Sequence, residues 1–328
     1  MPSAFRSLAR VVGRALLVVA PLCAAFGAHA QGHAGPVRVL VGYPPGGPAD
    51  TAARIGAEKL AVELGQPVVV DNKPGAGGQI AAQALKAAPA DGSVLFMSNA
   101  HTVAMVPLTM KAAGFAPATD FRTIGTVATF ELALAVHPKT GAANLQELGA
   151  WLGAHPGGAG IGVPAPASAP EFVAGKVSRV LRVDTVPVAY RGAAPMVSDL
   201  LGGQVAAGVS GISDFIQYQQ AGKLRILAVS RATPLLPGVP SFSQAGVAGL
   251  DNTTDFLGLY APAALPDAVV VRYNTALNRV LAQPEVIARL QGHVMTAAPS
   301  TPAEQAQHLA QVSKAFAGLV QESGFVPQ

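Results

Sequence analysis

Short apolar runs alternate with longer segments of helical periodicity after residue 36. Residues 37–41 have a buried-strand pattern and residues 49–64 a helical pattern, and the order continues with 68–71, 79–88 and 94–97. Strands that alternate with helices of about 10–15 residues are typical of parallel βαβ units. The chain is therefore predicted to be an α/β protein.

The alternation continues through the middle of the chain without an internal sequence repeat. A length of 328 residues suggests one large or two medium domains. A polar loop is expected at 211–214. The other predicted elements are strands at 132–136, 160–163, 205–210 and 224–230 and helices at 144–154, 171–181, 194–201, 268–282 and 301–323.

The first thirty residues have the three regions of an export signal. Three arginines, the last at Arg14, precede an apolar run at 15–28, and Ala28-His29-Ala30 places small residues around a cleavage site. An uncleaved membrane anchor is the alternative, but a spanning helix needs about 20 apolar residues. We predict a signal peptide at residues 1–30, cleavage after Ala30 and a periplasmic mature protein.

Removal of this segment changes the charge and the cysteine content. The whole chain has 22 Lys+Arg and 18 Asp+Glu, and loss of three arginines leaves 19 basic against 18 acidic residues, a net charge of +1. A nearly neutral chain gives no support for nucleic-acid binding. Cys23, the single cysteine, is also removed, so disulfides and cysteine metal sites are excluded from the mature protein.

Motifs of common exported hydrolases and nucleotide-binding enzymes are missing. The sequence has no G-x-x-x-x-G-K-[ST], no G-x-G-x-x-G after a strand, no H-E-x-x-H and no G-x-S-x-G, and its seven histidines lack metal-ligand spacing. Neither a cofactor nor a metal is expected. An exported enzyme acting on a carboxylated metabolite stays an alternative, with His101 and Asp214 as its acid–base candidates.

Glycine-rich turns connect the first strands to their helices. The turn at 42–48 opens directly onto a helix, whose unpaired N–H groups and dipole favour an anion, and the turn at 73–78 has a similar arrangement. Ordinary β-to-α turns are the alternative. Because the carboxyl ends of parallel strands share one sheet edge, we expect residues 98–101 to lie beside these turns. The candidate ligand-binding residues there are Tyr43, Pro44, Gly46, Gly47, Asp50, Ser98, Asn99 and His101.

Four polar candidates have a second interpretation. Asp50 either touches the ligand or orients its loop from the first helical turn. His101 either contacts the ligand or is a partly buried loop histidine. Arg191, which precedes Gly192, either binds a carboxylate with two hydrogen bonds or is solvated at a strand end. Asp214 either belongs to the site or is only a polar loop residue.

Eight stretches occur in a fixed order along nearly the whole mature chain. They are GYPPGGPADTAAR at 42–54, VVDNKPGAGG at 69–78, APADG at 88–92, VPVAYRG at 186–192, DLLGGQV at 199–205, LRILAVS at 224–230, LPGVPS at 236–241 and YAP at 260–262. As an ordered set they resemble the substrate-binding receptors of tripartite tricarboxylate transporters, the Bug-type periplasmic receptors.

The resemblance implies a two-lobed type II periplasmic binding fold, in which each lobe is a mostly parallel sheet flanked by helices. Lobe 1 would comprise residues 31–134 and 232–328 and lobe 2 residues 135–231, with hinge crossings near 133–137 and 229–235. The ligand would lie in the cleft between the lobes. By position, the family's site would add Pro164, Ser168, Tyr190, Arg191 and Gly192.

The implied ligand is a small carboxylate: a di- or tricarboxylate, an acidic amino acid or an aromatic acid. A monomeric receptor would pass it to a permease of two membrane subunits, and a role as the ligand-binding partner of a sensor kinase ectodomain stays open. The sequence departs from the family pattern at three places, of which the first and third affect the ligand's identity. The loop at 162–170 contains three prolines, Arg191 replaces a lysine while keeping the charge, and no tryptophan stands at 255–259.

Overall fold

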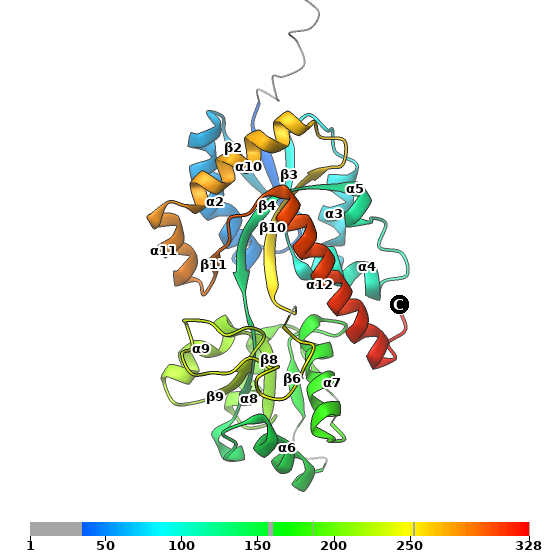
Figure 1. Cartoon of the computed structure of the whole chain (residues 1–328), viewed down its shortest axis with the longest axis vertical. Helices are drawn as coiled ribbons and strands as arrows, with labels where there is room; N and C mark the ends of the chain where they lie inside the picture. Colours follow the sequence, from blue (N-terminus) through cyan, green and yellow to red (C-terminus); the bar gives the residue numbers. More distant parts are fainter. Residues whose placement is uncertain (1–34, 157–159, 186, 252, 328) are drawn as a thin grey trace, which may run out of the picture.

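The computed structural model describes residues 35–156, 160–185, 187–251 and 253–327. The predicted signal peptide at 1–30 and the cleavage site after Ala30 lie outside these residues. The described chain forms two lobes stacked along the long axis of the molecule (Figure 1). In these ranges no helix has the length and apolar character needed to cross a bilayer.

A six-stranded sheet forms the centre of lobe 1, with the strand order β11-β4-β10-β3-β1-β2. Its strands are β1 (Val37–Val41), β2 (Val68–Asn72), β3 (Val94–Asn99), β4 (Phe121–Phe130), β10 (Asp255–Pro262) and β11 (Thr296–Ala297). One face packs on α2 (Pro48–Leu64), α10 (Asp267–Leu281) and α11 (Pro284–Gly292). The other packs on α3 (Gln79–Lys86), η3 (His101–Met105), α4 (Val106–Thr109) and α12 (Pro302–Ser323).

Lobe 2 has a five-stranded sheet in the order β7-β6-β8-β5-β9. Its strands are β5 (Leu132–Val136), β6 (Ile161–Val163), β7 (Val188–Ala189), β8 (Ala207–Gly211) and β9 (Arg225–Val229). Helices α6 (Leu145–Ala154) and α7 (Ala169–Leu181) cover one face, and α8 (Ala193–Leu201) and α9 (Ile212–Gln220) cover the other. Each sheet therefore lies between two layers of helices, which is the predicted α/β architecture.

Both sheets are mixed, so the expectation of mostly parallel sheets was wrong. In lobe 1, β1 is parallel to β2 and β3, but β10 is antiparallel to β3 and β4. In lobe 2, β5 is antiparallel to β8 and β9. Strands β5 and β10, which begin directly after the chain has passed from one sheet to the other, run antiparallel to their neighbours, and the short β11 is also antiparallel to β4.

Among the elements that the sequence did not predict are the long strands β4 and β10 and the helix α9. β4 and β10 are buried on both faces along most of their length, so neither has the polar alternation of a half-exposed strand. The expected loop at 211–214 is the start of α9, with Asp214 in the first helical turn. The expected strands at 37–41 and 132–136 are confirmed at both ends.

The chain passes between the sheets at Glu131 and again through a return segment, whose described residues are 230–251 and 253–254. The expected boundary at 134/135 falls inside β5. On the return, the Phe242 N–H donates to the carbonyl of Val229 at 2.8 Å, and the Gln146 amide donates to the carbonyl of Ala245 at 3.1 Å. We propose on these contacts that lobe 2 begins at Leu132 and includes most of the return segment.

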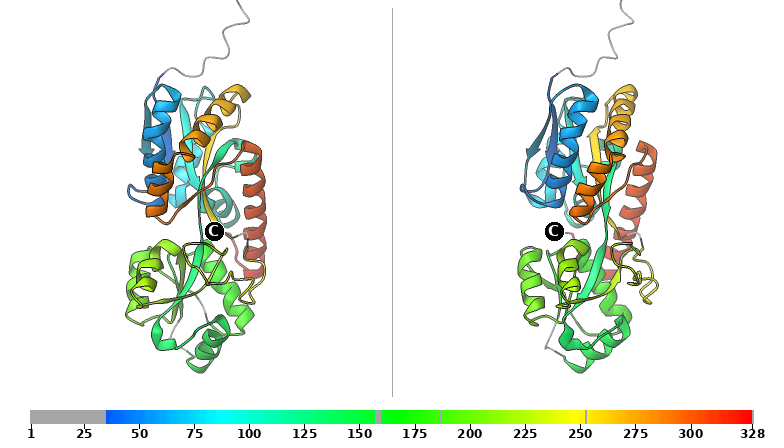
Figure 2. Two further views of the ribbon diagram at one scale, coloured as in Figure 1. Left: turned by 60° about the vertical axis from the view of Figure 1, so that its left-hand side comes forward. Right: turned by 90° about the vertical axis from the view of Figure 1, so that its left-hand side faces the viewer.

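Helix α12 lies beside both lobes (Figure 2). It packs against β4 and η3 in lobe 1, and near its end against α7 in lobe 2. There the Nζ of Lys176 lies 3.2 Å from a carboxylate oxygen of Glu322, and the rings of Phe172 and Phe325 meet edge to face at 5.6 Å between centroids. The C-terminal helix thus forms a third connection between the lobes.

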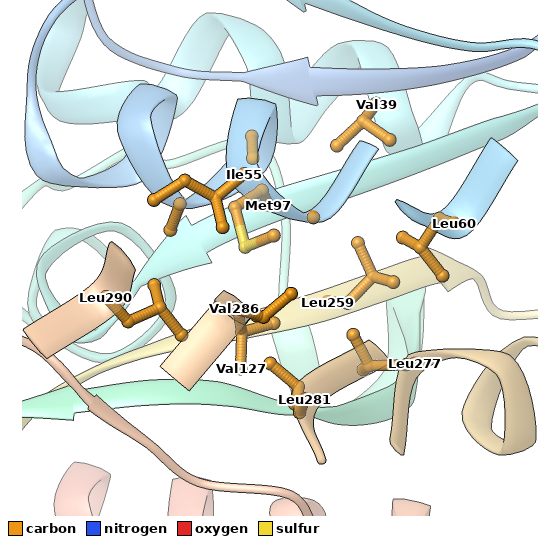
Figure 3. A pocket seen from close by; sticks show the side chains of 13 residues that line it. Val39, Ile55, Leu60, Met97, Val127, Leu259, Leu277, Leu281, Val286 and Leu290 are labelled. Atoms are coloured by element: carbon orange, nitrogen blue, oxygen red, sulfur yellow. The ribbon is translucent and has the colours of Figure 1, made fainter. Parts of the chain in front are cut away.

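The core of lobe 1 contains a small apolar cavity between α2, the sheet and helices α10 and α11 (Figure 3). Its volume of about 10 Å³ is at the lower limit for one water molecule. Ile55, Met97 and Leu259 are among its lining residues, and Gly56 of α2 contributes no side chain to it. The cavity is far too small for a metabolite and is a packing defect of the core.

Candidate functional site

The topology turns one edge of each sheet toward the other lobe. In lobe 1 this edge is formed by the ends of β1, β3 and β4 and by the start of β10. In lobe 2 it is formed by the ends of β6, β7, β8 and β9 and by the start of β5. These facing edges are joined by the passage at Glu131 and by the return segment (Figure 1). The loops expected to bind ligand therefore belong to the facing edges of two different lobes.

Asp50 organises the loop after β1. It is only 2% exposed, and it accepts hydrogen bonds from the Gly46 N–H at 2.8 Å, the Arg54 Nε at 3.0 Å and the Asn72 Nδ2 at 2.9 Å. Burial opposes its ionisation, but these hydrogen bonds outweigh burial and lower the pKa of Asp50. Of the two roles considered for Asp50, its contacts fit orientation of the loop.

Tyr43 joins the loops that follow three strands. Its hydroxyl lies 2.9 Å from Asn99 Oδ1, 2.9 Å from Thr102 Oγ1 and 3.2 Å from the carbonyl of Gly77. Burial is the main cause that raises the pKa of Tyr43 to about 12, so the hydroxyl stays protonated at neutral pH. Tyr43 and Asn99 are thus brought together as expected, with their polar groups bonded mainly to each other and to neighbouring loops.

Glycine allows these loops to pack closely. A Cβ on Gly78 would lie 2.3 Å from Thr102 Oγ1, and one on Gly77 would lie 2.8 Å from His101 Nε2. Both glycines also have positive φ angles. The glycines of this turn therefore serve loop packing. His101 is half-buried beside them, and desolvation lowers the pKa of its imidazole.

The N-terminus of α2 is exposed and has no side-chain cap. Gly47 is its N-cap, Pro48 follows at the first helical position, and Pro44 and Gly46 are exposed beside it. The N–H groups of Gly47, Ala49 and Asp50 have no acceptor among the described residues. Such a helix start binds anions through its free donors and dipole. Ser98, by contrast, is fully buried in β3 and does not reach the surface.

The starts of α7 and α8 in lobe 2 also lack side-chain caps. Ser168 precedes α7, but its hydroxyl donates to the Ala165 carbonyl at 2.6 Å. Gly192 precedes α8 with a φ of 111°, and its N–H donates to the Pro164 carbonyl at 2.8 Å. This bond joins the loops after β6 and β7. The predicted residues of lobe 2 are thus brought to one edge, with two further helix N-termini.

The side chains of Arg191 and Tyr190 differ in whether they have a partner within the described part of the protein. Arg191 is exposed and forms no ion pair with any residue that the structure describes. The hydroxyl of Tyr190 instead donates to Asp199 Oδ2 at 2.9 Å, and burial is the main cause that raises the pKa of Tyr190 to about 12. Arg191 therefore has a guanidinium available for a ligand, whereas the Tyr190 hydroxyl is already engaged.

Asp214 and His101 lie in different lobes. Asp214 accepts a hydrogen bond of 2.5 Å from the Ser210 hydroxyl, and burial raises the pKa of its carboxyl. His101 belongs to η3 of lobe 1. No hydrogen bond or ion pair joins these two side chains in the described chain.

Two carboxylates on the facing edges were not anticipated. Glu131 is 7% exposed at the passage between the sheets and accepts hydrogen bonds from Ser230 at 2.6 Å and Arg231 at 3.0 Å. Asp255, at the start of β10, accepts from the N–H of Ala100 at 3.0 Å. Burial raises the pKa of Asp255 to about 7, and the charge of Glu131 adds to the effect. An acidic residue directly before the apolar run 256–262 is the signal that would have drawn attention to Asp255.

The comparisons with known proteins agree with this geometry. A family model described as the tripartite tricarboxylate transporter family receptor matches residues 52–325. Protein BugT of Bordetella pertussis is 29% identical over 294 residues, which are 88% of this chain and 89% of BugT.

Two solved structures are similar in fold and sequence. Rpa4515 of R. palustris with adipate has a TM-score of 0.78 and 26% identity, covering 89% of this chain and 98% of its own. MatC of Rhodopseudomonas palustris with bound malate has a TM-score of 0.72 and 27% identity, covering 87% of this chain and 98% of its own. The two-lobed fold and the resemblance seen in the sequence are confirmed, and the chain belongs to the tripartite tricarboxylate transporter receptor family, whose members include Bug-type periplasmic solute-binding proteins.

Proposed function

We propose that this protein is an extracytoplasmic receptor that binds a small carboxylate between its lobes without changing it. Uncapped helix N-termini on both facing edges carry the proposal. The start of α2 offers free N–H groups from lobe 1, and the starts of α7 and α8 face it from lobe 2. Helix N-termini attract carboxylates, so a ligand with two such groups could engage both lobes at once.

Arg191 supplies the positive charge for this arrangement. It follows β7 on the facing edge of lobe 2 and has no ion-pair partner among the described residues. A guanidinium binds a carboxylate with two parallel hydrogen bonds, which adds both affinity and geometric selection. The adipate and malate in the two similar structures are small dicarboxylates, which supports the same ligand class here.

Ligand binding would favour approach of the two lobes. A ligand held by donors of both lobes stabilises the arrangement in which the facing edges lie close, because only there are both sets of bonds made. The protein would then present a closed, monomeric, ligand-loaded form to the membrane subunits of a tripartite uptake system. Export through the segment at 1–30 would place it in the periplasm, and a sensor ectodomain is the alternative partner.

A thermal-shift screen with adipate, malate, citrate, glutamate and benzoate tests the proposal. A ligand that binds only the folded protein raises its melting temperature, with a stabilisation of about 2.7 kcal/mol at one hundred times Kd. NMR of the best ligand, kept with the protein for a day, should show no new signals. Conversion of the ligand would support the enzyme alternative, and stabilisation by none of these acids would contradict the proposed ligand class.

A further inference from the structure

Asp255 places a carboxylate in the middle of the facing edge of lobe 1. It lies opposite Phe130 on β4, and two residues further on Leu257 lies opposite Asn99 on β3. Its Oδ1 accepts the N–H groups of Ala100 at 3.0 Å and Phe256 at 2.9 Å. Its Oδ2 bonds to none of the described residues and is not among the atoms sealed in the core.

No positive side chain neutralises Asp255 within the described chain. None of the ion pairs there includes it, and the charge that acts on it most clearly is that of Glu131, which is itself engaged by Arg231. The field of Asp255 extends to Tyr43, where it adds to the effect of burial on the hydroxyl. The carboxylate therefore lies within electrostatic reach of the loop that leads to the free donors of α2.

A negative charge at this place is unfavourable for a receptor of plain carboxylates. When ionised, it repels an anion that approaches the start of α2, and a half-buried carboxylate without a cation is costly to keep ionised. Both costs disappear when the ligand itself carries a positive hydrogen-bond donor next to its carboxylates. Such a ligand would place its ammonium group on Oδ2 of Asp255 and its carboxylates at the helix starts.

We infer that Asp255 makes this receptor selective for amino dicarboxylates over dicarboxylates that lack the amino group. The inference rests on the proposed function and narrows its ligand class. Asp255 acts here as a specificity-determining residue, because one of its oxygens is held by Ala100 and Phe256 and the other remains available. The ammonium of the ligand then takes the place of the missing cation.

Calorimetry on two matched ligand pairs tests the inference. Aspartate and succinate differ only in the amino group, as do glutamate and glutarate. The wild-type protein is expected to bind the amino member of at least one pair about tenfold or more tightly, the usual effect of a hydrogen bond between charged groups. Asp255→Asn retains an acceptor for the two N–H groups but loses the charge, and should reduce the preference to less than about twofold.

Asp120→Asn is the matched control. Asp120 also accepts a backbone N–H at a helix start, that of Ala116 at 2.8 Å, but it lies away from the facing edges and pairs with Lys86. This variant should keep the wild-type preference. Melting temperatures of both variants show whether each is folded.

The outcomes separate the inference from the proposed function. A preference that is lost in Asp255→Asn and kept in Asp120→Asn supports the inference. The inference is overturned if the wild-type protein prefers succinate and glutarate, or if Asp255→Asn loses affinity equally for both ligands of a pair. Neither result contradicts the proposed function as a carboxylate receptor. If none of the four acids binds, the inference fails, and the wider thermal-shift screen decides the proposed function separately.

Discussion

Gly47→Val tests whether the start of α2 holds the ligand. Gly47 has φ −77° and ψ 168°, an extended conformation that valine adopts readily. An ideal Cβ there would meet only the Pro44 carbonyl, at 3.7 Å, so the fold has room for it. Because valine is a poor N-cap, we expect a stability loss of about 1 kcal/mol. The larger effect should be on binding, since the side chain would cover the free N–H groups.

The magnitude follows from the donors that valine would cover. Each hydrogen bond to a charged group contributes about 1.5–3 kcal/mol, and the helix dipole adds about 0.3–1 kcal/mol. Loss of one such bond together with the dipole contribution gives about 3 kcal/mol, or roughly a hundredfold weaker binding. Calorimetry with the best carboxylate of the screen measures this directly.

Gln283→Val provides the matched control. Gln283 is the N-cap of α11 with a similar extended conformation, but it lies away from the facing edges. Because the Gln283 side chain makes no cap hydrogen bond, this variant should keep its stability and lose no affinity. Wild-type affinity in a folded Gly47→Val variant would refute the assignment of α2 as an anion-binding helix start.

Three further predictions concern affinity, packing and pH. Arg191→Ala should weaken carboxylate binding by more than about 1.4 kcal/mol, or tenfold, with Arg191→Lys in between; a smaller loss in titration calorimetry would make Arg191 an ordinary surface residue. Gly56→Ala should raise the free energy of unfolding in urea by about 1 kcal/mol, because an ideal Cβ there meets nothing within 4 Å and alanine favours the helix. Asp255, whose pKa is raised from 3.8 to about 7 by burial, contributes stability that is complete below its unfolded pKa and is lost as the pH rises through 7. Unfolding of wild type and Asp255→Asn between pH 4 and 8 should therefore show the variant gaining relative stability as the pH rises, and parallel profiles would contradict this.

The sequence predicts those elements whose structure is determined by local pattern. The strand at 37–41 and the helix of 48–64 follow from apolar periodicity and a proline at the first helical position. β4 and β10 could not be read this way, since burial on both faces removes alternation and their partners lie far away in sequence. Whether a strand is parallel or antiparallel depends likewise on the strands that it pairs with, which are distant in sequence. This is why the sheets were wrongly predicted to be mostly parallel.

The candidate site was predictable in outline but not in its individual roles. Pattern placed Asp50 at a helix start, but its choice between ligand and loop depends on Asn72, a residue 22 positions away. The apolar run predicts that Ser98 follows the strand at 94–97, whereas β3 continues to Asn99 and buries Ser98. The expected loop around Asp214 is helical because Ser213 and Asp214 suit a first helical turn as well as a loop.

The third connection through α12 has a consequence for how affinity is determined. A hinge of two passages alone would leave the lobes free to rotate, but Glu322 at the end of α12 and Phe325 just after it also contact α7. Any rotation of one lobe against the other must move the contact between α12 and α7 with it, bend α12 or separate the rings of Phe172 and Phe325. The dissociation constant therefore includes the energetic cost of deforming a contact outside the binding site. Substitutions at the C-terminus can alter ligand retention without touching the ligand.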